Sequence, residues 1–454
     1  MTTVASSVRE PEQPSARQLT GCQPVEVVYL VVREGLSGVF DAQVLRPLSK
    51  YGAEVRARVV VCEPIGSFVR TDGRRAQQER GIRASSLGVD LATIPSAPAR
   101  AKWLWDDCHL LRRWLGRKFG PADVFIVHAR GSAAALLALG MRRWFPHVRV
   151  IFDCRGAEPA EQEELLALAG ETHSRTGRRR LRVVQWTERV SATQSDHVLC
   201  VSKAMADYLS ERYAMQVARV TVVPCCVDTD MFAKAAHERD ATRRELGVAD
   251  RLVVAYCGSL EFYQCPDESL RIFAAIKARR PDAHFLALTR SADRMRQFCK
   301  SAGFRDEDCT VLSLEPAAVP RYLAASDVGL LPRQESLVNR VASPVKFAEY
   351  LASGTPVILS NQIGDYSELA RWKNVGLVLP SSGRGAGAAE IPSLLSGFLD
   401  QYVADPGAWR RRCQRVAQEA LDWNAHLPRV AAVYDQVSKA PVTAASRLIR
   451  MVDQ

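Results

Sequence analysis

The sequence predicts an α/β protein made of two successive parallel sheets, and three observations lead to this prediction. Short runs of β-branched and other apolar residues alternate with longer amphipathic stretches, as in parallel sheets covered by helices. The chain has 454 residues, which is too long for one compact core and fits two domains of ordinary size. The alternation stops around ATRRELGVADR and then starts again, which favours two sheets over one.

The first sheet is expected within residues 25–223, after a disordered lead-in at residues 1–24. Its first strand, VEVVYLVV at residues 25–32, is apolar on both faces, as a buried parallel strand should be. A loop at 33–38 and a helix at 39–52 follow. Further strands are expected at 55–61, 89–94, 124–128, 148–153 and 197–202, and one long helical stretch at 160–193.

A connection that contains proline and aspartate, VTVVPCCVDTDMF at residues 220–232, is expected to join the two domains. The second domain is placed at residues 233–424. The last segment, 425–454, is expected to begin with a helix that crosses back to the first domain and is anchored by Trp423. The strands of the second domain are expected in the runs LVVAYCGS, HFLALT, CTVLSL, VGLLP, TPVILS and VGLVLP.

Composition limits the class of protein. Hydrophobic residues make up 47% of the chain and charged residues 24%, which is typical of a globular protein and excludes disorder over most of the length. We expect a cytoplasmic protein, because no apolar run is long enough to span a membrane and the N-terminus has no secretory core. The twelve cysteines show no C-x-x-C spacing and are expected to be free thiols. The net charge of +11 favours anionic partners.

The strongest motif is NRVASPVKFAEYLASGTPVILSN at residues 339–361. Ser343 is a good N-cap and Pro344 suits the first helical position. The free amides of such a helix start, together with its dipole, form a site for an anion such as a diphosphate. Glu349 lies further along the helix, where its carboxylate could accept hydrogen bonds from two vicinal hydroxyls. The alternative is an ordinary helix–strand unit in which Lys346 and Glu349 are solvated.

This motif, S-P-x-K-x-x-E-Y-L-A-x-G-x-P-V-I, resembles the donor-binding segment of the group 1 (family 4) glycosyltransferases. That family has the GT-B fold, two Rossmann-like domains that face each other across a cleft. Other segments resemble the family in the same order: VLCVSKAMADYLSERY, VTVVPCCVDTDMF, VVAYCGSLEFYQCPDESLRIF and VPRYLAASDVGLLPR. The resemblance implies a retaining transfer of a sugar from a nucleotide-diphosphate sugar to a glycan, lipid-linked or small-molecule acceptor, without metal or other cofactor.

The resemblance also implies roles for residues of the second domain. Glu349 would bind the nucleotide ribose, but Val341 stands where the family has a second glutamate beside the donor sugar. Many relatives carry an arginine and a lysine just after the Gly-Ser-Leu turn, and GSLEFYQC has neither. A diphosphate still needs cationic partners, and Arg290, Arg333 and Lys346 are the candidates for this role. The expected donor-binding residues are Gly258, Ser259, Arg290, Arg333, Ser343, Pro344, Val345, Lys346 and Glu349.

In the first domain, relatives often show H-x-H after the fourth strand, and this chain has His128-Ala129-Arg130. His128 and Arg130 are therefore the catalytic candidates, with a buried core histidine as the alternative for His128. The residues expected to approach the acceptor or line the cleft are Gly35, Gly38, Asp153 and Arg155. For the two glycines, a plain strand–helix turn is the alternative.

Two further sequence motifs are interpreted as having no binding function. The sequence Asp228-Thr229-Asp230 copies a D-x-D metal motif but falls in the interdomain connection, where aspartate favours turns. We therefore expect no catalytic metal. The run GRGAG at residues 383–387 imitates a dinucleotide fingerprint without its spacing, and it is interpreted as a loop.

Two other functions remain open for this fold. One is a sugar-nucleotide 2-epimerase, and the other is a catalytically silent homologue that acts as a binding partner in glycan assembly. A basic cluster, HSRTGRRRLRVV at residues 173–184, suits a peripheral contact with anionic lipids at the inner face of the membrane. Its alternative is a solvated helix face. Nucleic acid is not expected, because no aromatic residue is interleaved in the cluster.

Overall fold

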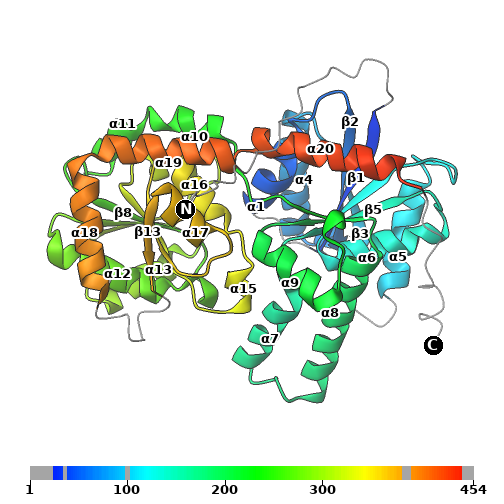
Figure 1. Ribbon diagram of the computed structural model, residues 1–454, viewed down its shortest axis with the longest axis horizontal. Helices are drawn as coiled ribbons and strands as arrows, with labels where there is room; N and C mark the ends of the chain where they lie inside the picture. Colours follow the sequence, from blue (N-terminus) through cyan, green and yellow to red (C-terminus); the bar gives the residue numbers. More distant parts are fainter. Residues whose placement is uncertain (1–23, 34–37, 98–102, 381–389, 442–454) are drawn as a thin grey trace, which may run out of the picture.

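The computed structural model describes residues 24–33, 38–97, 103–380 and 390–441. It contains a seven-stranded and a six-stranded sheet, both parallel, which lie side by side with helices on their faces (Figure 1). The two α/β sheets expected from the alternation are thus confirmed. No helix in the described ranges is long and apolar enough to cross a membrane.

The first domain is built on the seven-stranded sheet, in the order β3-β2-β1-β4-β5-β6-β7. Its strands are β1 (Val25–Val32), β2 (Val55–Pro64), β3 (Asp90–Ser96), β4 (Ile126–Arg130), β5 (Arg149–Cys154), β6 (His197–Cys200) and β7 (Val220–Val222). Its helices are α1 (Gly38–Phe40), α2 (Arg46–Leu48), α3 (Gly66–Val69), α4 (Thr71–Ser86), α5 (Trp103–Leu115), α6 (Ser132–Gly140), α7 (Glu158–Leu168), α8 (Arg175–Gln194) and α9 (Lys203–Tyr213).

The second domain is built on the six-stranded sheet, in the order β10-β9-β8-β11-β12-β13. Its strands are β8 (Val253–Cys257), β9 (His284–Leu288), β10 (Cys309–Leu312), β11 (Val328–Leu331), β12 (Val357–Ser360) and β13 (Gly376–Leu379). Its helices are α10 (Thr229–Ala236), α11 (Arg239–Glu245), α12 (Pro266–Arg279), α13 (Ala292–Ser301), α14 (Val319–Ala324), α15 (Leu337–Arg340), α16 (Val345–Ala352), α17 (Tyr366–Lys373), α18 (Ile391–Ala404) and α19 (Pro406–Ala420).

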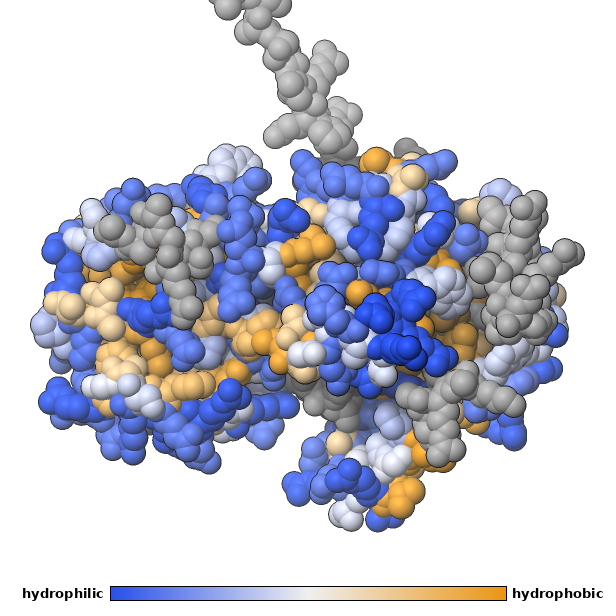
Figure 2. All heavy atoms as spheres, turned by 90° about the horizontal axis from the view of Figure 1, so that it is seen from below, coloured by the Kyte–Doolittle hydropathy of each residue, from blue (hydrophilic) through white to orange (hydrophobic). Residues whose placement is uncertain are grey.

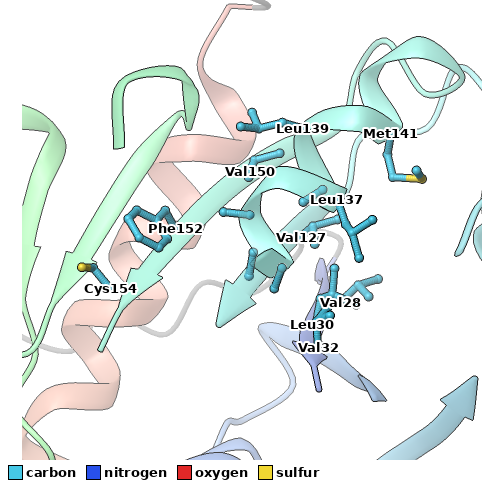
Figure 3. Packing of buried hydrophobic residues seen from close by; sticks show 14 of the residues in the cluster. Val28, Leu30, Val32, Val127, Leu137, Leu139, Met141, Val150, Phe152 and Cys154 are labelled. Carbon is cyan, nitrogen blue, oxygen red and sulfur yellow. The ribbon is translucent and has the colours of Figure 1, made fainter. Parts of the chain in front are cut away.

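The first sheet is buried on both faces because alternate residues of each strand point to opposite sides. Val28, Val127 and Phe152 pack on the side of α6 (Figure 3). Ile126 and Ile151 point the other way and pack against α20 (Trp423–Lys439), which leaves the second domain and lies along the first (Figure 1). The start of α20 is held by Trp423, whose indole donates a hydrogen bond to the Ala42 carbonyl at 3.0 Å.

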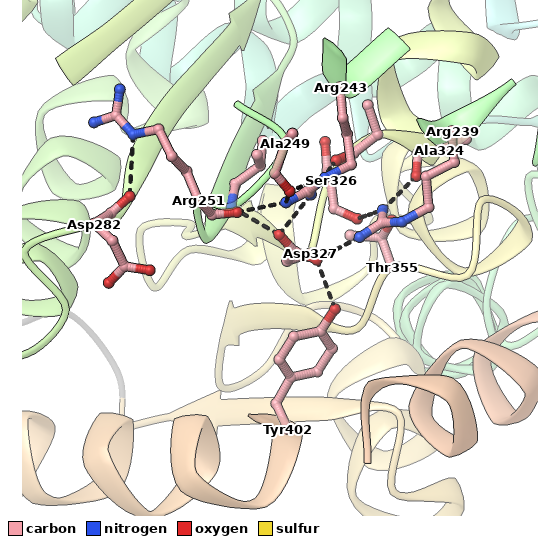
Figure 4. A network of polar contacts seen from close by, with 12 residues as sticks. Arg239, Arg243, Ala249, Arg251, Asp282, Ala324, Ser326, Asp327, Thr355 and Tyr402 are labelled. Atoms are coloured by element: carbon pink, nitrogen blue, oxygen red, sulfur yellow. Dashed lines mark hydrogen bonds and ion pairs between the residues drawn. The ribbon is translucent and has the colours of Figure 1, made fainter. Parts of the chain in front are cut away.

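A buried aspartate explains why the alternation breaks at ATRRELGVADR. Asp327 precedes β11 and receives hydrogen bonds from Arg239 (2.5 Å), Arg243 (2.9 Å) and Tyr402 (2.9 Å), as Figure 4 shows. Burial alone would raise the pKa of this carboxyl, but the two guanidinium groups outweigh burial and lower it. Arg239, just before this segment, and Arg243 within it thus fasten α11 to the second sheet.

The helix expected at 39–52 contains a π-helical turn at Asp41–Leu45 between α1 and α2. Pro47 explains this difference, because proline has no N–H for the carbonyl four residues earlier and widens the turn before it. Asp41 adds ion pairs to Arg46 (2.8 Å) and Arg83 (2.7 Å) across this turn.

The helical stretch expected at 160–193 is in fact a hairpin of two helices, α7 and α8, which projects from the body of the first domain (Figure 1). Gly170 has a positive φ of 67° just after α7, a conformation that glycine adopts without strain. Ser174 then caps α8 by accepting a hydrogen bond from the Gly177 amide at 2.8 Å. Both features stop one helix and start the next, so the predicted helical stretch is divided into two helices.

The base of the hairpin carries a buried acid that makes stability depend on pH. Glu188 of α8 is fully buried and accepts hydrogen bonds from Tyr208 (3.0 Å) and Tyr213 (2.6 Å) of α9. Burial raises the pKa of Glu188 to about 7. The stability that the protonated acid contributes is therefore complete below about pH 4, the pKa of an unfolded glutamate, and is lost as the pH rises through 7.

We expect Glu188→Gln to increase the free energy of unfolding by about 2–3 kcal/mol at pH 8, because the glutamine side chain is uncharged at this pH and burial at this site favours an uncharged group. The difference from wild type should vanish near pH 4. Urea unfolding at the two pH values measures this, with Glu163→Gln on the exposed side of α7 as the control. Equal stability of Glu188→Gln and wild type at pH 8 would contradict it.

Candidate active site

The carboxyl ends of β8 and β11 are where the second sheet can bind a ligand. These strands are neighbours, but the chain leaves β8 toward β9 and leaves β11 toward β12, in opposite directions. Open parallel sheets bind ligands in the crevice at such a switch point. A groove of about 530 Å³ lies there. It is lined by residues that include Leu260, Phe262, Cys265, Arg271, Arg294, Phe298, Arg333, Gln334, Glu335 and Ser360.

The start of α16 lies one residue later than the sequence predicted. Pro344 is the N-cap and Val345 the first helical residue. Ser343 does not cap the helix because its hydroxyl is used elsewhere: it accepts a hydrogen bond from the Cys225 amide (2.9 Å) and bonds the Tyr366 hydroxyl (2.7 Å). The amides of Val345 and Lys346 precede the first hydrogen bond of this turn, donated by Phe347 to Pro344, so they can bind an anion.

Lys346 and Glu349 form an ion pair of 2.7 Å on the first turns of α16. Their side chains are only 23% and 12% exposed, so the alternative of two solvated side chains does not hold. Burial alone would lower the pKa of Lys346, but the Cys257 thiol and the Glu349 carboxylate outweigh burial and raise it. Lys346 is therefore a charged ammonium at the helix start that the motif predicted as an anion site.

The other candidate cations differ in burial. Arg333 follows β11, is buried, and donates a hydrogen bond to the Tyr263 carbonyl at 3.0 Å while its guanidinium lies 5.6 Å from the Tyr263 ring. Burial lowers its pKa. Arg290 follows β9 and is exposed. At the turn after β8, Gly258 donates to the Leu288 carbonyl, and Ser259 is exposed.

Val341 does not lie open at this site. Its side chain is 1% exposed and belongs to the hydrophobic cluster of the first domain. Its carbonyl accepts a hydrogen bond of 2.7 Å from Ser202 at the start of α9. The position where the family resemblance places a carboxylate is thus part of an interdomain contact.

In the first domain, Asp153 is the centre of a buried charged cluster. Its carboxylate accepts a hydrogen bond from Tyr29 (3.1 Å) and lies 3.5 Å from His128, 3.5 Å from Arg155 and 3.8 Å from Arg130. Burial would raise the pKa of Asp153, but Arg155, His128 and Arg130 outweigh burial and hold the pKa well below its usual range. The sequence singles out His128, Arg130, Asp153 and Arg155 separately, and the structure brings them together.

His128 lies inside this cluster. It stacks on Tyr29 with 4.3 Å between ring centroids, and its Nδ1 lies 2.6 Å from the Tyr434 hydroxyl of α20. It is buried, which agrees with the core-histidine alternative. Arg130 is the last residue of β4. Gly38 begins α1, and Gly35 lies outside the described residues.

Cys225, in the connection between the domains, links the two parts of the site. Its thiol accepts a hydrogen bond of 3.0 Å from Arg155, and its amide donates to Ser343 just before α16. Arg155 also donates to Gln43 at 2.9 Å. Sequence reasoning missed Cys225, Gln43 and Tyr434, because their roles depend on contacts between residues far apart in the chain.

The first aspartate of the D-x-D sequence is paired within the protein, and the second, Asp230, is exposed. Asp228 precedes α10 and forms ion pairs with Lys50 (3.2 Å) and Arg46 (3.6 Å) of the first domain. Within the described ranges, no group of three or more His, Cys, Asp or Glu side chains is placed to hold a metal ion. The GRGAG run at 383–387 lies outside the described residues.

Two family models match the chain. A family model described as Glycosyltransferase Family 4 matches residues 42–231, and one described as Glycosyl transferases group 1 matches residues 251–396. The D-inositol 3-phosphate glycosyltransferase of Actinosynnema mirum is 30% identical over 190 residues, which are 39% of this chain and 44% of that protein. The putative teichuronic acid biosynthesis glycosyltransferase TuaH of Bacillus subtilis is 22% identical over 213 residues, 47% and 50% of the two chains.

The matched part thus spans about half the length of these curated relatives. Among solved structures, HepE of Anabaena in complex with UDP and glucose has a TM-score of 0.62 at 12% identity, over 91% of this chain and all of that one. A glycosyltransferase from Rickettsia africae has a TM-score of 0.64 at 13% identity, over 92% and 100%. At these identities the likeness concerns the fold.

Proposed function

The chain belongs to the family 4 glycosyltransferases and has the GT-B fold, and on that premise we propose that it transfers a glycosyl group from a nucleotide-diphosphate sugar, with retention, to a glycan, lipid-linked or small-molecule acceptor. The observation that carries the proposal is the Lys346–Glu349 pair at the start of α16, beside the end of β8. It combines a cation for a diphosphate with a carboxylate for the ribose hydroxyls.

The geometry supports a reaction that needs no metal ion. In the transfer, the bond between the anomeric carbon and the donor phosphate oxygen breaks, and negative charge grows on the leaving diphosphate. The Lys346 ammonium and the amides of Val345 and Lys346 can stabilise that charge. We rank Lys346 first among the cations, Arg333 second because it already holds Tyr263, and Arg290 third because it is exposed.

On the acceptor side, we propose that the acceptor hydroxyl attacks the same face of the sugar and that its proton passes to the leaving diphosphate. Arg130 at the end of β4 is the proposed contact of this domain with the reacting groups. Asp153 lies 3.5 Å from His128, 3.5 Å from Arg155 and 3.8 Å from Arg130, so we assign Asp153 and His128 to holding the two arginines in place. Glu349 is paired and Asp153 is surrounded by cations, which leaves neither suited to the proton abstraction that a 2-epimerase requires.

A panel of nucleotide sugars tests the proposal. The purified chain is incubated with each donor and a cell extract in the presence of EDTA, and the products are identified by mass spectrometry. Transfer of one sugar with release of nucleoside diphosphate is expected. Conversion of a donor without any acceptor would instead indicate an epimerase. Absence of binding to UDP, GDP and ADP by isothermal titration would indicate a silent homologue.

We further propose that the acceptor is reached at an anionic membrane surface, at its inner face. The hairpin helix α8 exposes five arginines, and among the described residues only Arg180 of these forms an ion pair, with Glu171 at 3.8 Å. Figure 2 looks from below onto the end of the hairpin, where strongly hydrophilic side chains gather. The arginines in question are Arg175, Arg178, Arg179, Arg180 and Arg182.

Exposed Leu165, Leu168 and Val183 lie on the same two helices and suit an interfacial position.

Anionic vesicles sedimented at low salt should carry the wild-type protein into the pellet. Replacing Arg178 and Arg182 by serine should weaken the affinity for anionic vesicles about tenfold or more, since each arginine contributes about 1 kcal/mol of binding free energy. The control replaces Arg411 and Arg415, which are exposed on α19. A protein that stays in the supernatant with anionic vesicles has a soluble acceptor.

A further inference from the structure

The loop between β11 and α16 is attached to the other domain. Its short helix α15 packs against α7 of the first domain. Leu337 and Val338 of α15 contact the hydrophobic cluster built on β1, β4, β5 and α6, and Val341 is buried in that cluster with 1% of its surface exposed. This second-domain loop therefore has its apolar contacts in the core of the first domain.

Polar contacts fasten the same loop at the start of α9. Ser202 donates a hydrogen bond to the Val341 carbonyl at 2.7 Å while accepting one from the Met205 amide. The Asp365 carboxylate, which comes just before α17, accepts hydrogen bonds from the amides of Lys203 (2.7 Å) and Ala204 (3.3 Å). An acid at a helix start satisfies free amides and complements the dipole, so these contacts also join the two domains.

The attached loop leads directly into the proposed donor site. Three residues, 342–344, separate Val341 from the first residue of α16. Ser343 in this short link is held by the Cys225 amide of the interdomain connection. The position of Lys346 thus depends on where the side chain of Val341 packs.

From these contacts we infer that Val341 is a positioning residue: it is the apolar anchor by which the first domain holds the start of α16 and couples donor binding to contact between the domains. The inference rests on the proposed donor site at α16. Separation of the domains exposes Val341 and releases the loop, whereas a bound nucleoside diphosphate favours the attached arrangement. A carboxylate at this position would have to enter an apolar core, which is costly for an unpaired charge.

Substitutions at position 341 test this against the opposite expectation, that the position faces the donor sugar. If Val341 is the anchor, Val341→Glu should weaken binding of UDP or whichever nucleoside diphosphate binds wild type by at least tenfold. It should also enlarge the radius of gyration in small-angle scattering and increase hydrogen exchange in 337–346. Val341→Ala should weaken binding of the nucleoside diphosphate roughly tenfold, in proportion to the buried methyl groups that are removed. Val341→Ile should restore near wild-type binding.

The matched control is Val403→Glu, which adds the same charge at an exposed position of α18. Tighter donor binding or faster transfer by Val341→Glu, with unchanged scattering, would overturn the inference. Unchanged exchange and scattering in both Val341→Glu and Val341→Ala would also overturn it. If wild type binds no nucleoside diphosphate, the proposed function fails, but scattering and exchange still report whether Val341 holds the domains together.

Discussion

Replacing Lys346 with methionine should lower kcat/KM for glycosyl transfer by about 10² to 10³, the usual cost of losing a group that stabilises developing charge. The ammonium lies at the start of α16, paired with Glu349 at 2.7 Å. Methionine keeps much of the side-chain length and removes the charge. The loss should appear in kcat as well as in donor affinity, because the charge on the leaving diphosphate grows as the bond breaks.

A double substitution separates this effect from the damage done by an orphaned carboxylate. Lys346→Met leaves Glu349 nearly buried without its partner, which by itself is destabilising. Lys346→Met with Glu349→Gln removes both charges and should regain stability in urea without regaining activity. Lys300→Met, exposed on α13, is the control. A fall in kcat/KM of less than about tenfold in Lys346→Met would show that another cation holds the diphosphate.

Asp153→Asn should destabilise the protein by about 3–5 kcal/mol, the range seen when one partner of a buried charge cluster is removed. The carboxylate is 4% exposed and is the shared partner of Arg155, His128 and Arg130. Without it, positive groups face one another in the core beneath α20. Urea unfolding at pH 7 measures the loss, and Asp207→Asn on the exposed side of α9 is the control.

The destabilisation by Asp153→Asn should also depend on pH in a defined direction. The pKa of Asp153 is held below its usual range by the surrounding cations, which outweigh burial. Its stabilising contribution is therefore complete above the unfolded pKa of about 4 and is lost as the pH falls below that value toward the folded pKa. Wild type and Asp153→Asn should converge in acid. A constant difference down to pH 2.5 would contradict the ion-pair account.

Several features of this protein were predictable because they depend on residues close together in the chain. Apolar residues on both faces identify strand runs such as Val25–Val32, and the predicted bounds of this strand are those of β1 in the structure. The order of the motifs around Glu349 identified the family. Prediction was weaker where short-range signals compete: Gly170 and Ser174 divide a stretch of helical composition into α7 and α8, and Ser343 looks like a cap but bonds Cys225 instead.

Other features depend on residues that meet only after both domains have folded. The family resemblance makes His128 a catalytic candidate, but Tyr29 and Tyr434, 99 and 306 positions away, enclose it in the core. In the sequence, Val341 stands where the family resemblance leads one to expect an acid. In the structure its side chain is buried in the hydrophobic cluster of the first domain. No spacing within the motif could indicate this, because the cluster that receives Val341 is built on strands β1 to β6, and the last of these ends at Cys200.

By itself the sequence determined the two parallel sheets, the family, and the helix start near Pro344 at which we propose an anion site, because strand patterning and helix starts are encoded by neighbouring residues. Only the tertiary structure decided which cation stands at that site, which charged residues are buried and paired, and which domain holds Val341. The physical reason is that burial and electrostatic pairing act over distances of a few ångströms in space, and the residues they join here lie up to hundreds of positions apart in the chain.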